Sequence, residues 1–345
     1  MIEQIIAKFS MPYRESLVMQ AFSFGIDEEG RTLGGGALTD GMDRALCLVA
    51  GLRGDEVQQT FICARLVDRL RQMEAEGALA PNNLITVIPC ANPASMAIGW
   101  RFWPGDKTDI NRMFPGYDQG ETTQRIAAAL FEQVKGFRYG VHFGSFHLQG
   151  DFLPHVRVMH GPGSTGNHGA DFGLPYVLHH VPGSFDTTTL HYNWRLWDTE
   201  AYTLYTKETE LVNEESADEV VQAVLRFANA RGIVRFPNQP NQLDRPTPEL
   251  GERALVGVAV PTGGVFCPKT QIGDTVSKDQ ELAVIVDPLR GSVLAELAAP
   301  CDGVVLYTAR TPLVNEDTLA FQLVPTDVET IGDSEQRGNF LDPEA

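Results

Sequence analysis

The run TDINRMFPG at residues 108–116 holds three polar side chains that could act together in chemistry: Asp109, Asn111 and Arg112. A carboxylate accepts hydrogen bonds, an amide both donates and accepts them, and a guanidinium binds a carboxylate through two parallel hydrogen bonds. Such a run is either a polar turn or one wall of a binding site. The choice depends on the side chains that the rest of the chain places opposite it.

The histidines are concentrated in one part of the chain. All eight lie in the 50 residues from 142 to 191, where an even spread over 345 residues would place about one: His142, His147, His155, His160, His168, His179, His180 and His191. Histidine is the commonest metal ligand and titrates near neutral pH, so the cluster favours a functional site. Polar loops also carry surface histidines, so we expect at most two or three of the eight to take part in chemistry. Neighbours on a strand point to opposite faces, so His179 and His180 are not expected to enter the same site.

Strands that alternate with helices must position these side chains. Short apolar runs predict strands, and apolar residues at helical spacing predict helices. The expected strands span 45–51, 83–90 and 139–146, and the expected helices span 55–77, 121–137 and 215–234. This alternation predicts an α/β domain with a mostly parallel sheet. In such a sheet, ligands bind at the loops after the carboxyl ends of the strands, which here are 51–56, 91–116 and 142–155.

A change in composition marks the end of this domain. Residues 235–252 hold four prolines and no apolar run, which indicates a linker or an extended crossing. Beyond it, 263–285 and 302–323 form an imperfect repeat of short β-type runs, which predicts a small β-sandwich or barrel. We therefore expect an α/β domain at 1–240 and a β domain at 241–345 that ends in an acidic tail. The repeat resembles biotinyl/lipoyl barrels in plan, but their Met-Lys-Met triplet is absent, so a carrier role is not expected.

Composition argues against several partners. The formal net charge of −18 argues against nucleic acids and acidic membranes, both of which attract basic surfaces. The stretch from Leu84 to Trp100 is interrupted by Pro89, Asn92 and Pro93, so no membrane span is expected. Five scattered cysteines and a charged N-terminus predict reduced thiols in a cytoplasmic protein. The expected partner is a small-molecule carboxylate substrate. A homo-oligomer, in which the chain binds further copies of itself, is also possible.

Several motifs, taken in order, resemble the succinylglutamate desuccinylase/aspartoacylase family. They are GLRGDE at 51–56, NPASMAIGWRFWPGDKTDINRMFPG at 92–116, the helix that contains ETTQRIA, and GVHFG at 140–144. The resemblance covers most of residues 40–325. It implies a zinc-carboxypeptidase-like α/β fold, with a mixed sheet flanked by helices, followed by a small C-terminal β domain. It also implies metal-assisted hydrolysis of an amide or ester bond in a small carboxylate-bearing acyl compound, such as an N-acyl amino acid.

The resemblance implies substrate-binding roles for three residues. In the family, an Asn-Arg pair lines the substrate pocket, and its arginine binds the carboxylate of an acyl amino acid. Asn111 and Arg112 match this pair, and Arg101 matches an arginine upstream in the same loop. The alternative is that Arg112 only holds its own loop through Asp106 or Asp109.

The metal positions of the family carry different residues here. The first zinc motif of the family has a histidine and, three residues later, a glutamate. Glu56 matches the glutamate, but Arg53 stands at the histidine, and a guanidinium has no lone pair to offer a metal. In the second motif His142 matches the metal-binding histidine, but Gly140 stands where the family has an aspartate.

The base of the family's reaction also differs. A glutamate in a Thr-x-Glu-x-Gly strand acts there on a metal-bound water. The nearest match here starts at Thr203 and places Tyr205 at the glutamate position. Glu208, three residues further on, is the candidate base.

These departures leave two hypotheses. In the first, a zinc ion is retained by Glu56, His142 and a third ligand, since a catalytic zinc needs about three protein ligands. The third ligand is then His147 or Asp55, and the protein is a metallo-hydrolase, which is the favoured activity. In the second, Arg53 replaces the zinc and neutralises Glu56, and the protein binds a small molecule without a metal and without hydrolysing it.

Overall fold

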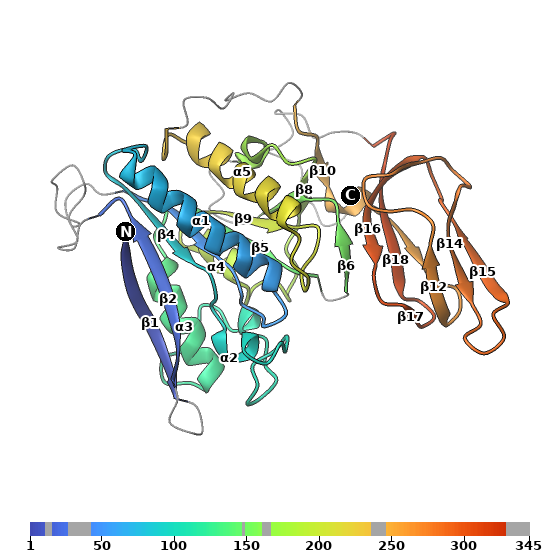
Figure 1. The fold of residues 1–345 in the computed structure, drawn as a ribbon, viewed down its shortest axis with the longest axis horizontal. Helices are drawn as coiled ribbons and strands as arrows, with labels where there is room; N and C mark the ends of the chain where they lie inside the picture. Colours follow the sequence, from blue (N-terminus) through green and yellow to red (C-terminus); the bar gives the residue numbers. More distant parts are fainter. Residues whose placement is uncertain (11–15, 27–42, 147–148, 161–166, 236–245, 329–345) are drawn as a thin grey trace.

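The computed structural model describes residues 1–10, 16–26, 43–146, 149–160, 167–235 and 246–328. Figure 1 shows a larger part, in which helices pack on a sheet, and a smaller all-β part formed by the C-terminal residues. The predicted fold class, an α/β domain with an additional β unit, is therefore confirmed. Residue 147, most of the Pro-rich linker and the acidic tail lie outside the described residues.

The larger part is built on a nine-stranded mixed sheet with the order β1-β2-β4-β3-β5-β9-β7-β8-β10. Its strands are β1 (Ile2–Ser10), β2 (Ser16–Phe24), β3 (Asp43–Val49), β4 (Asn83–Ile88), β5 (Tyr139–Gly144), β7 (His155–Met159), β8 (Val177–His180), β9 (Glu200–Tyr205) and β10 (Glu249–Gly251). β4, β3, β5 and β9 pair in parallel, as predicted for the core of the sheet. β7 runs antiparallel to β9, and β1 and β2 form an antiparallel edge, so the sheet is mixed.

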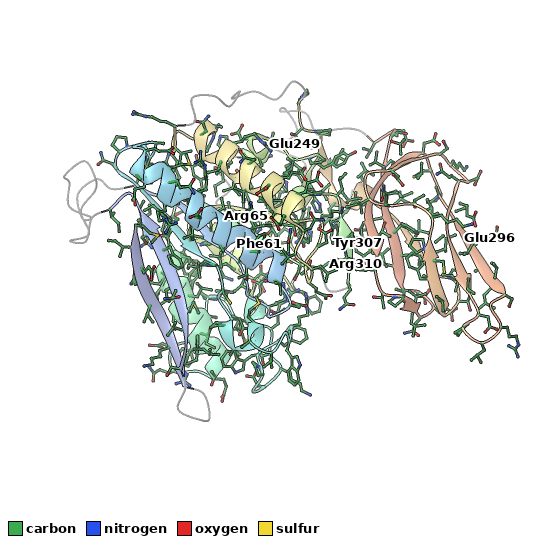
Figure 2. All side chains as sticks on the ribbon, viewed as in Figure 1. Phe61, Arg65, Glu249, Glu296, Tyr307 and Arg310 are labelled. Carbon is green, nitrogen blue, oxygen red and sulfur yellow. The ribbon has the colours of Figure 1, made fainter. Side chains whose placement is uncertain are left out.

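Helices cover both faces of this sheet. They are α1 (Val57–Ala75), α2 (Pro93–Met96), α3 (Thr122–Val134), α4 (Leu190–Leu196) and α5 (Glu214–Ala230), with short 3-10 turns η1 (Ile110–Arg112), η2 (Gly169–Phe172) and η3 (Glu252–Ala254). α1 and α5 lie side by side (Figure 1), and Arg65 of α1 (Figure 2) pairs with Glu214 and Asp218 of α5 at 3.3 and 3.1 Å. The helices predicted at 55–77, 121–137 and 215–234 are thus confirmed within a few residues at each end.

Strand β3 shows why a continuous apolar run marks the centre of the sheet. Leu46 and Leu48 pack in the core beneath α1 and α5, whereas Cys47 and Val49 pack in the core beneath α3 and α4. Successive side chains of a strand point to opposite faces, so a strand buried on both faces needs apolar residues at every position.

The C-terminal part contains two antiparallel sheets around their own apolar core. The strands are β11 (Val256–Ala259), β12 (Gly264–Pro268), β13 (Thr275–Val276), β14 (Glu281–Val286), β15 (Val293–Ala298), β16 (Gly303–Ala309), β17 (Leu313–Val314) and β18 (Leu319–Pro325). One sheet has the order β11-β18-β16-β13 and the other β15-β14-β12-β17. The β-type character predicted from the repeat is confirmed, because the copy at 263–285 forms β12 to β14 and the copy at 302–323 forms β16 to β18.

The two parts share strands across the boundary that the sequence places near residue 240. β6 (Gly150–Phe152) belongs in sequence to the α/β part but pairs antiparallel with β16 (Figure 1), where Phe152 lies opposite Tyr307. β10 follows the Pro-rich segment but pairs in parallel with β8 of the main sheet. The C-terminal part is therefore fixed against the loops that follow β5.

Candidate functional site

A cavity of about 270 Å³ lies where the strand-end loops of the main sheet meet, and we name it the arginine cavity. The loop after β3 supplies Arg53, the long loop after β4 supplies Arg101 and Arg112, and β7 supplies Arg157. The other walls include His142 and Ser145 at the end of β5, Thr203 and Tyr205 at the end of β9, and His191 of α4. The cavity lies at the carboxyl ends of β5 and β9, as expected for an open α/β sheet.

Arg53 points into this site and is buried, with a side-chain exposure of 7%. Its Nε and Nη2 atoms donate to Asp109 Oδ2 at 3.1 and 2.9 Å, and its Nη1 donates to Glu56 Oε1 at 3.2 Å. Burial alone would lower the pKa of Arg53, but the carboxylates of Asp109 and Glu56 outweigh it and raise that pKa. The guanidinium is therefore a permanent cation held between two carboxylates.

Both carboxylate oxygens of Glu56 are already occupied. Oε1 accepts from Arg53 Nη1 and from Ser145 Oγ at 2.7 Å, and Oε2 accepts from the Arg53 backbone amide at 3.2 Å. Glu56 is fully buried, and this burial raises its pKa against the opposing effects of Arg53 and Ser145. A metal at this carboxylate would have to displace the guanidinium.

Three of the four arginines in the cavity are bound to carboxylates. Besides Arg53, Arg101 Nη1 donates to Asp55 Oδ2 at 3.0 Å, and Arg157 donates through Nε and Nη2 to both oxygens of Glu252 at 3.0 Å. Arg112 is different, because within the described residues its side chain donates only to the backbone carbonyl of Phe185. Arg112 therefore lines the cavity with a cation that no described carboxylate neutralises.

His142 and His191 are the two histidines on the cavity wall. Burial, helped by the nearby Arg53 cation, lowers the pKa of His142 to about 3, so its ring is neutral near pH 7. The Nε2 atom of His142 has no hydrogen-bond partner among the described residues. His191 Nδ1 lies 2.7 Å from Thr203 Oγ1, and its Nε2 is likewise buried without a described partner.

The remaining predicted site residues have mixed positions. Asn111 lines the cavity, and its Oδ1 accepts from the Leu190 backbone amide at 3.0 Å, which ties the loop to α4. Tyr205 also lines the cavity and stacks on His155 with ring centroids 4.8 Å apart. Glu208 is not among the residues that line the cavity.

The Glu208 carboxylate faces a different set of partners. Its Oε1 accepts from Asn213 Nδ2 at 3.1 Å and lies 3.8 Å from Lys207 Nζ and 3.9 Å from Arg310 Nη2. The structure therefore does not bring the predicted base to the cavity that holds His142. The predicted ligand His147 lies outside the described residues.

Among the described residues, the donor set does not fit the zinc that the family resemblance implies. Glu56 and His142 are present, but the guanidinium of Arg53 stands at the position of the third donor and occupies Glu56. No group of three or more His, Cys, Asp or Glu side chains in the described part of the chain is arranged to hold a metal ion. A structural or catalytic zinc needs at least three such ligands.

Sequence reasoning missed several residues of this site. Ser145 connects Glu56 with Arg53 and Arg101, at 2.7, 3.4 and 3.3 Å, and no motif pointed to it. His191 belongs to the histidine cluster but could not be separated from its neighbours by spacing alone. His179 and His180 face different partners, as predicted, and neither lines the cavity.

The fold and site together define an α/β domain built on a mixed sheet, with an appended β unit and a cavity at the carboxyl ends of the strands. The model of the succinylglutamate desuccinylase/aspartoacylase catalytic domain matches residues 42–231. Because this match covers more than half of the chain, the chain belongs to the succinylglutamate desuccinylase/aspartoacylase family.

Named relatives agree with this assignment. The N-alpha-acetyl-L-2,4-diaminobutyric acid deacetylase of Halomonas elongata is 24% identical over an alignment of 307 residues, and the match covers 83% of this chain and 83% of that one. A succinylglutamate desuccinylase/aspartoacylase structure from Rhodobacter sphaeroides superposes with a TM-score of 0.70 at 19% identity, over 93% of this chain and 95% of that one. The product-bound ectoine utilization protein EutE (DoeB) from Ruegeria pomeroyi gives 0.69 at 17% identity, over 94% and 93%. At these identities the structural matches show the fold.

The family and the Halomonas relative suggest amide-bond deacylase function in general, because both names denote deacylases. These names identify neither a substrate of this chain nor a metal requirement. Separately, none of the helices in the described part of the chain has the length and apolar character needed to cross a bilayer.

Proposed function

We propose that the arginine cavity binds a small acyl compound through its carboxylate, and that it does so without a metal. The observation that carries this proposal is the position of Arg53, whose guanidinium binds Glu56 and Asp109 at the place where the family has a metal ligand. In this member of the family, the guanidinium of Arg53 then takes the place of the zinc ion.

Arg112 supplies the contact to the ligand carboxylate. A planar guanidinium matches a carboxylate with two parallel hydrogen bonds, and this arrangement is stronger than a contact between neutral groups. Arg112 is available for it because its described partner is a carbonyl, which leaves its positive charge uncompensated. Arg101 and Arg157 are already paired with Asp55 and Glu252, so they shape the wall and contribute less net charge.

A second candidate function is hydrolysis of the bound compound, the general activity suggested by the family. His142 favours it, because its neutral side chain lines the cavity and its buried Nε2 atom has no described partner. A neutral imidazole can accept a proton from water, and this would make His142 the base of a metal-free hydrolysis, although a weak one because burial lowers its pKa to about 3. Neither glutamate is available as the base. Glu56 already accepts hydrogen bonds from Ser145 and Arg53, and Glu208 bonds to Asn213 outside the cavity.

The test uses the full chain after chelator treatment and dialysis. Calorimetry with a panel of N-acetyl and N-succinyl amino acids measures binding, and detection of the released amine measures hydrolysis, each with and without added zinc. The proposal predicts saturable binding whose affinity zinc does not change, with no amine release above a blank.

The other outcomes separate the candidates. Zinc-independent amine release that is abolished in His142→Ala would establish the second candidate. Amine release only with zinc would contradict the metal-free account. Absence of binding by every member of the panel would refute the proposed ligand class.

A further inference from the structure

A second, larger pocket of about 620 Å³ adjoins the arginine cavity, and we name it the outer pocket. Arg101, Phe102 and Phe146 line both, so the two spaces share a wall. The Arg101 guanidinium stands at this boundary, because its Nη1 donates to Asp55 of the outer pocket and to Ser145 of the arginine cavity. Ligand pockets for drug-sized molecules have volumes of about 300–1,000 Å³, so the arginine cavity alone is small and the pair is ample.

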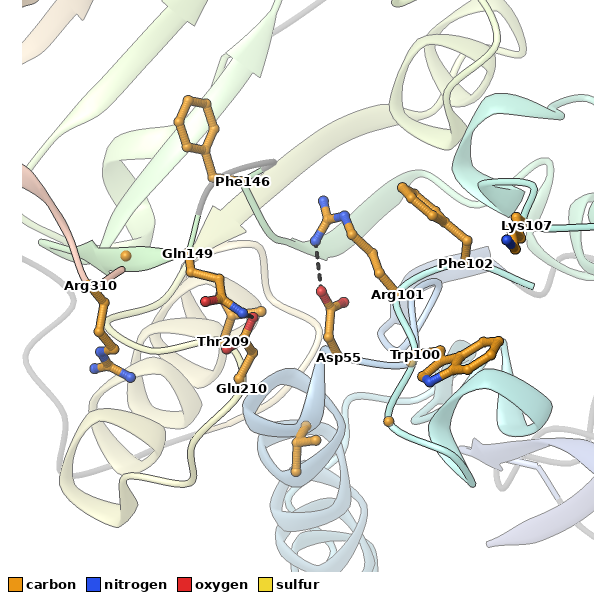
Figure 3. A pocket seen from close by; sticks show the side chains of 14 residues that line it. Asp55, Trp100, Arg101, Phe102, Lys107, Phe146, Gln149, Thr209, Glu210 and Arg310 are labelled. Atoms are coloured by element: carbon orange, nitrogen blue, oxygen red, sulfur yellow. Dashed lines mark hydrogen bonds and ion pairs between the residues drawn. The ribbon is translucent and has the colours of Figure 1, made fainter. Parts of the chain in front are cut away.

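The outer pocket is aromatic on one side. Figure 3 shows Trp100 and Phe102 on the same side of the Asp55–Arg101 pair, with Lys107 beyond them. Trp100 is 55% exposed and Phe102 is 40% exposed, which is unusual for such large apolar side chains. Adjacent exposed aromatic residues at the rim of a pocket mark a binding surface.

Two of the three cations of the outer pocket are paired, because Arg101 is bound to Asp55 and Arg310 pairs with Asp151. Lys107, beyond Phe102 (Figure 3), has no ion pair among the described residues. Glu210 accepts from the neutral Gln149 Nε2 at 2.8 Å, so its negative charge remains and disfavours an anionic group here. An anionic group of a ligand is therefore stabilised most in the arginine cavity beside Arg112. An apolar ring is stabilised most by contact with Trp100 and Phe102.

We propose that the outer pocket binds an aromatic acyl group of the same ligand whose carboxylate lies in the arginine cavity. This inference rests on the proposed function and makes it more specific: the ligand is an N-aroyl amino acid or a close analogue rather than an N-acetyl compound. The amide group of such a ligand would cross the boundary at Arg101, which can donate to its carbonyl oxygen.

The test compares three derivatives of the amino acid whose N-acetyl form binds best in the panel above: N-acetyl, N-benzoyl and N-octanoyl. Calorimetry on the native full chain should show the benzoyl compound binding at least about tenfold more tightly than the acetyl compound, because the ring is removed from water. The octanoyl compound should bind less tightly than the benzoyl compound, since a flexible chain loses more conformational entropy.

Variants locate the effect. Trp100→Ala should weaken benzoyl binding about three- to tenfold and leave acetyl binding within about twofold, because Trp100 lines only the outer pocket and the acetyl group does not reach it. Tyr117→Ala is the matched control, since Tyr117 is 57% exposed and lines neither space. It should change neither affinity, and thermal unfolding checks that each variant folds.

The outcomes are distinct for the two proposals. Equal affinities for the acetyl and benzoyl compounds would overturn this inference and leave the proposed function intact. Octanoyl binding as tight as benzoyl binding would overturn the aromatic specificity. If no acyl compound binds at all, the proposed function fails and this inference fails with it.

Discussion

At the scale of single residues, the charges that are already paired determine which groups of the site remain available to bind a ligand. Arg53 satisfies Glu56 and Asp109. Burial, together with the Arg53 cation, keeps His142 neutral, and its Nε2 atom has no partner among the described residues. Residues 108–116 form one wall of the cavity through Asp109, Asn111 and Arg112. Asp109 holds Arg53, and Arg112 lines the cavity without pairing with Asp109 or Asp106 in the structure.

Arg112 provides the prediction at this scale. Replacement by alanine should weaken binding of the carboxylate ligand about 10- to 100-fold, because a hydrogen bond to a charged group contributes about 1.5–3 kcal/mol. Replacement by lysine should restore part of the affinity, since it keeps the charge but loses the planar fork. Calorimetry measures both, and Arg71→Ala, an exposed arginine on α1, is the control. Unchanged affinity in Arg112→Ala would show that the carboxylate lies elsewhere.

At the scale of elements, β5 and α4 explain why the family's aspartate is absent from position 140. A Cβ atom on Gly140 would lie 2.8 Å from the ring of Trp194, which is fully buried in α4. The Trp194 indole also donates to the Val134 carbonyl at 2.9 Å, so the ring is fixed in place. The strand that carries His142 therefore packs against an aromatic ring where the family has a carboxylate.

This contact predicts the effect of a small substitution. Gly140→Ala should lower the free energy of unfolding by about 1–3 kcal/mol, because the added methyl group has no room against the Trp194 ring. Gly251→Ala is the matched control: a Cβ there meets no atom within 4 Å, so a change within about 0.5 kcal/mol is expected. Urea unfolding measures both. A Gly140→Ala variant as stable as the native protein would disprove the packing argument.

The sequence was most informative about elements with strong periodicity or continuous apolar character. β3, β4, β5, α1, α3 and α5 were predicted close to their observed bounds for this reason. The N-terminal strands β1 and β2 were not predicted. In β2 the buried positions include Ser23 and the half-buried positions include Phe22, so apolar and polar residues do not alternate in the sequence. The pairing of β6 with β16 joins residues more than 150 positions apart, and no local pattern specifies such a contact.

At the scale of the whole molecule, most of the described histidines lie outside the arginine cavity. Burial lowers the pKa of His155 and of His160 to about 4, from an ordinary value of 6.5. Between those two pH values, the unfolded chain binds protons at these rings and the folded chain does not, so stability falls as the pH falls. His180 opposes this effect, because its bonds to Asp186 and Glu252 outweigh its burial and raise its pKa.

The protein should therefore lose stability as the pH is lowered. The melting temperature should be highest above pH 6.5 and should decline toward pH 4. His155→Phe keeps a ring stacked on Tyr205 but cannot bind a proton, so its decline should be shallower than that of the native chain. Calorimetric melts from pH 4 to pH 8 measure the two slopes. Parallel curves would contradict the assignment of a depressed pKa to His155.

The residues of the candidate site could be predicted from the sequence, but the ion pairs and hydrogen bonds between them could not. Motif positions identified Arg53, Glu56, Arg112 and His142, and all four lie in or beside one cavity. Whether Arg53 faces inward depends on Asp109 and Ser145, which lie far from it in sequence. Such a choice between two rotamers is made by tertiary contacts, so the sequence left both hypotheses open.

The central claim is that Arg53 takes the place of a metal, and zinc titration of the chelator-treated full chain tests it most directly. Calorimetry should detect no tight zinc binding to the native protein at neutral pH. Arg53→His should bind zinc at least about tenfold more tightly, since a neutral ligand then replaces a repelling cation beside Glu56 and His142. Tight zinc binding by the native protein that is lost in His142→Ala would contradict the account.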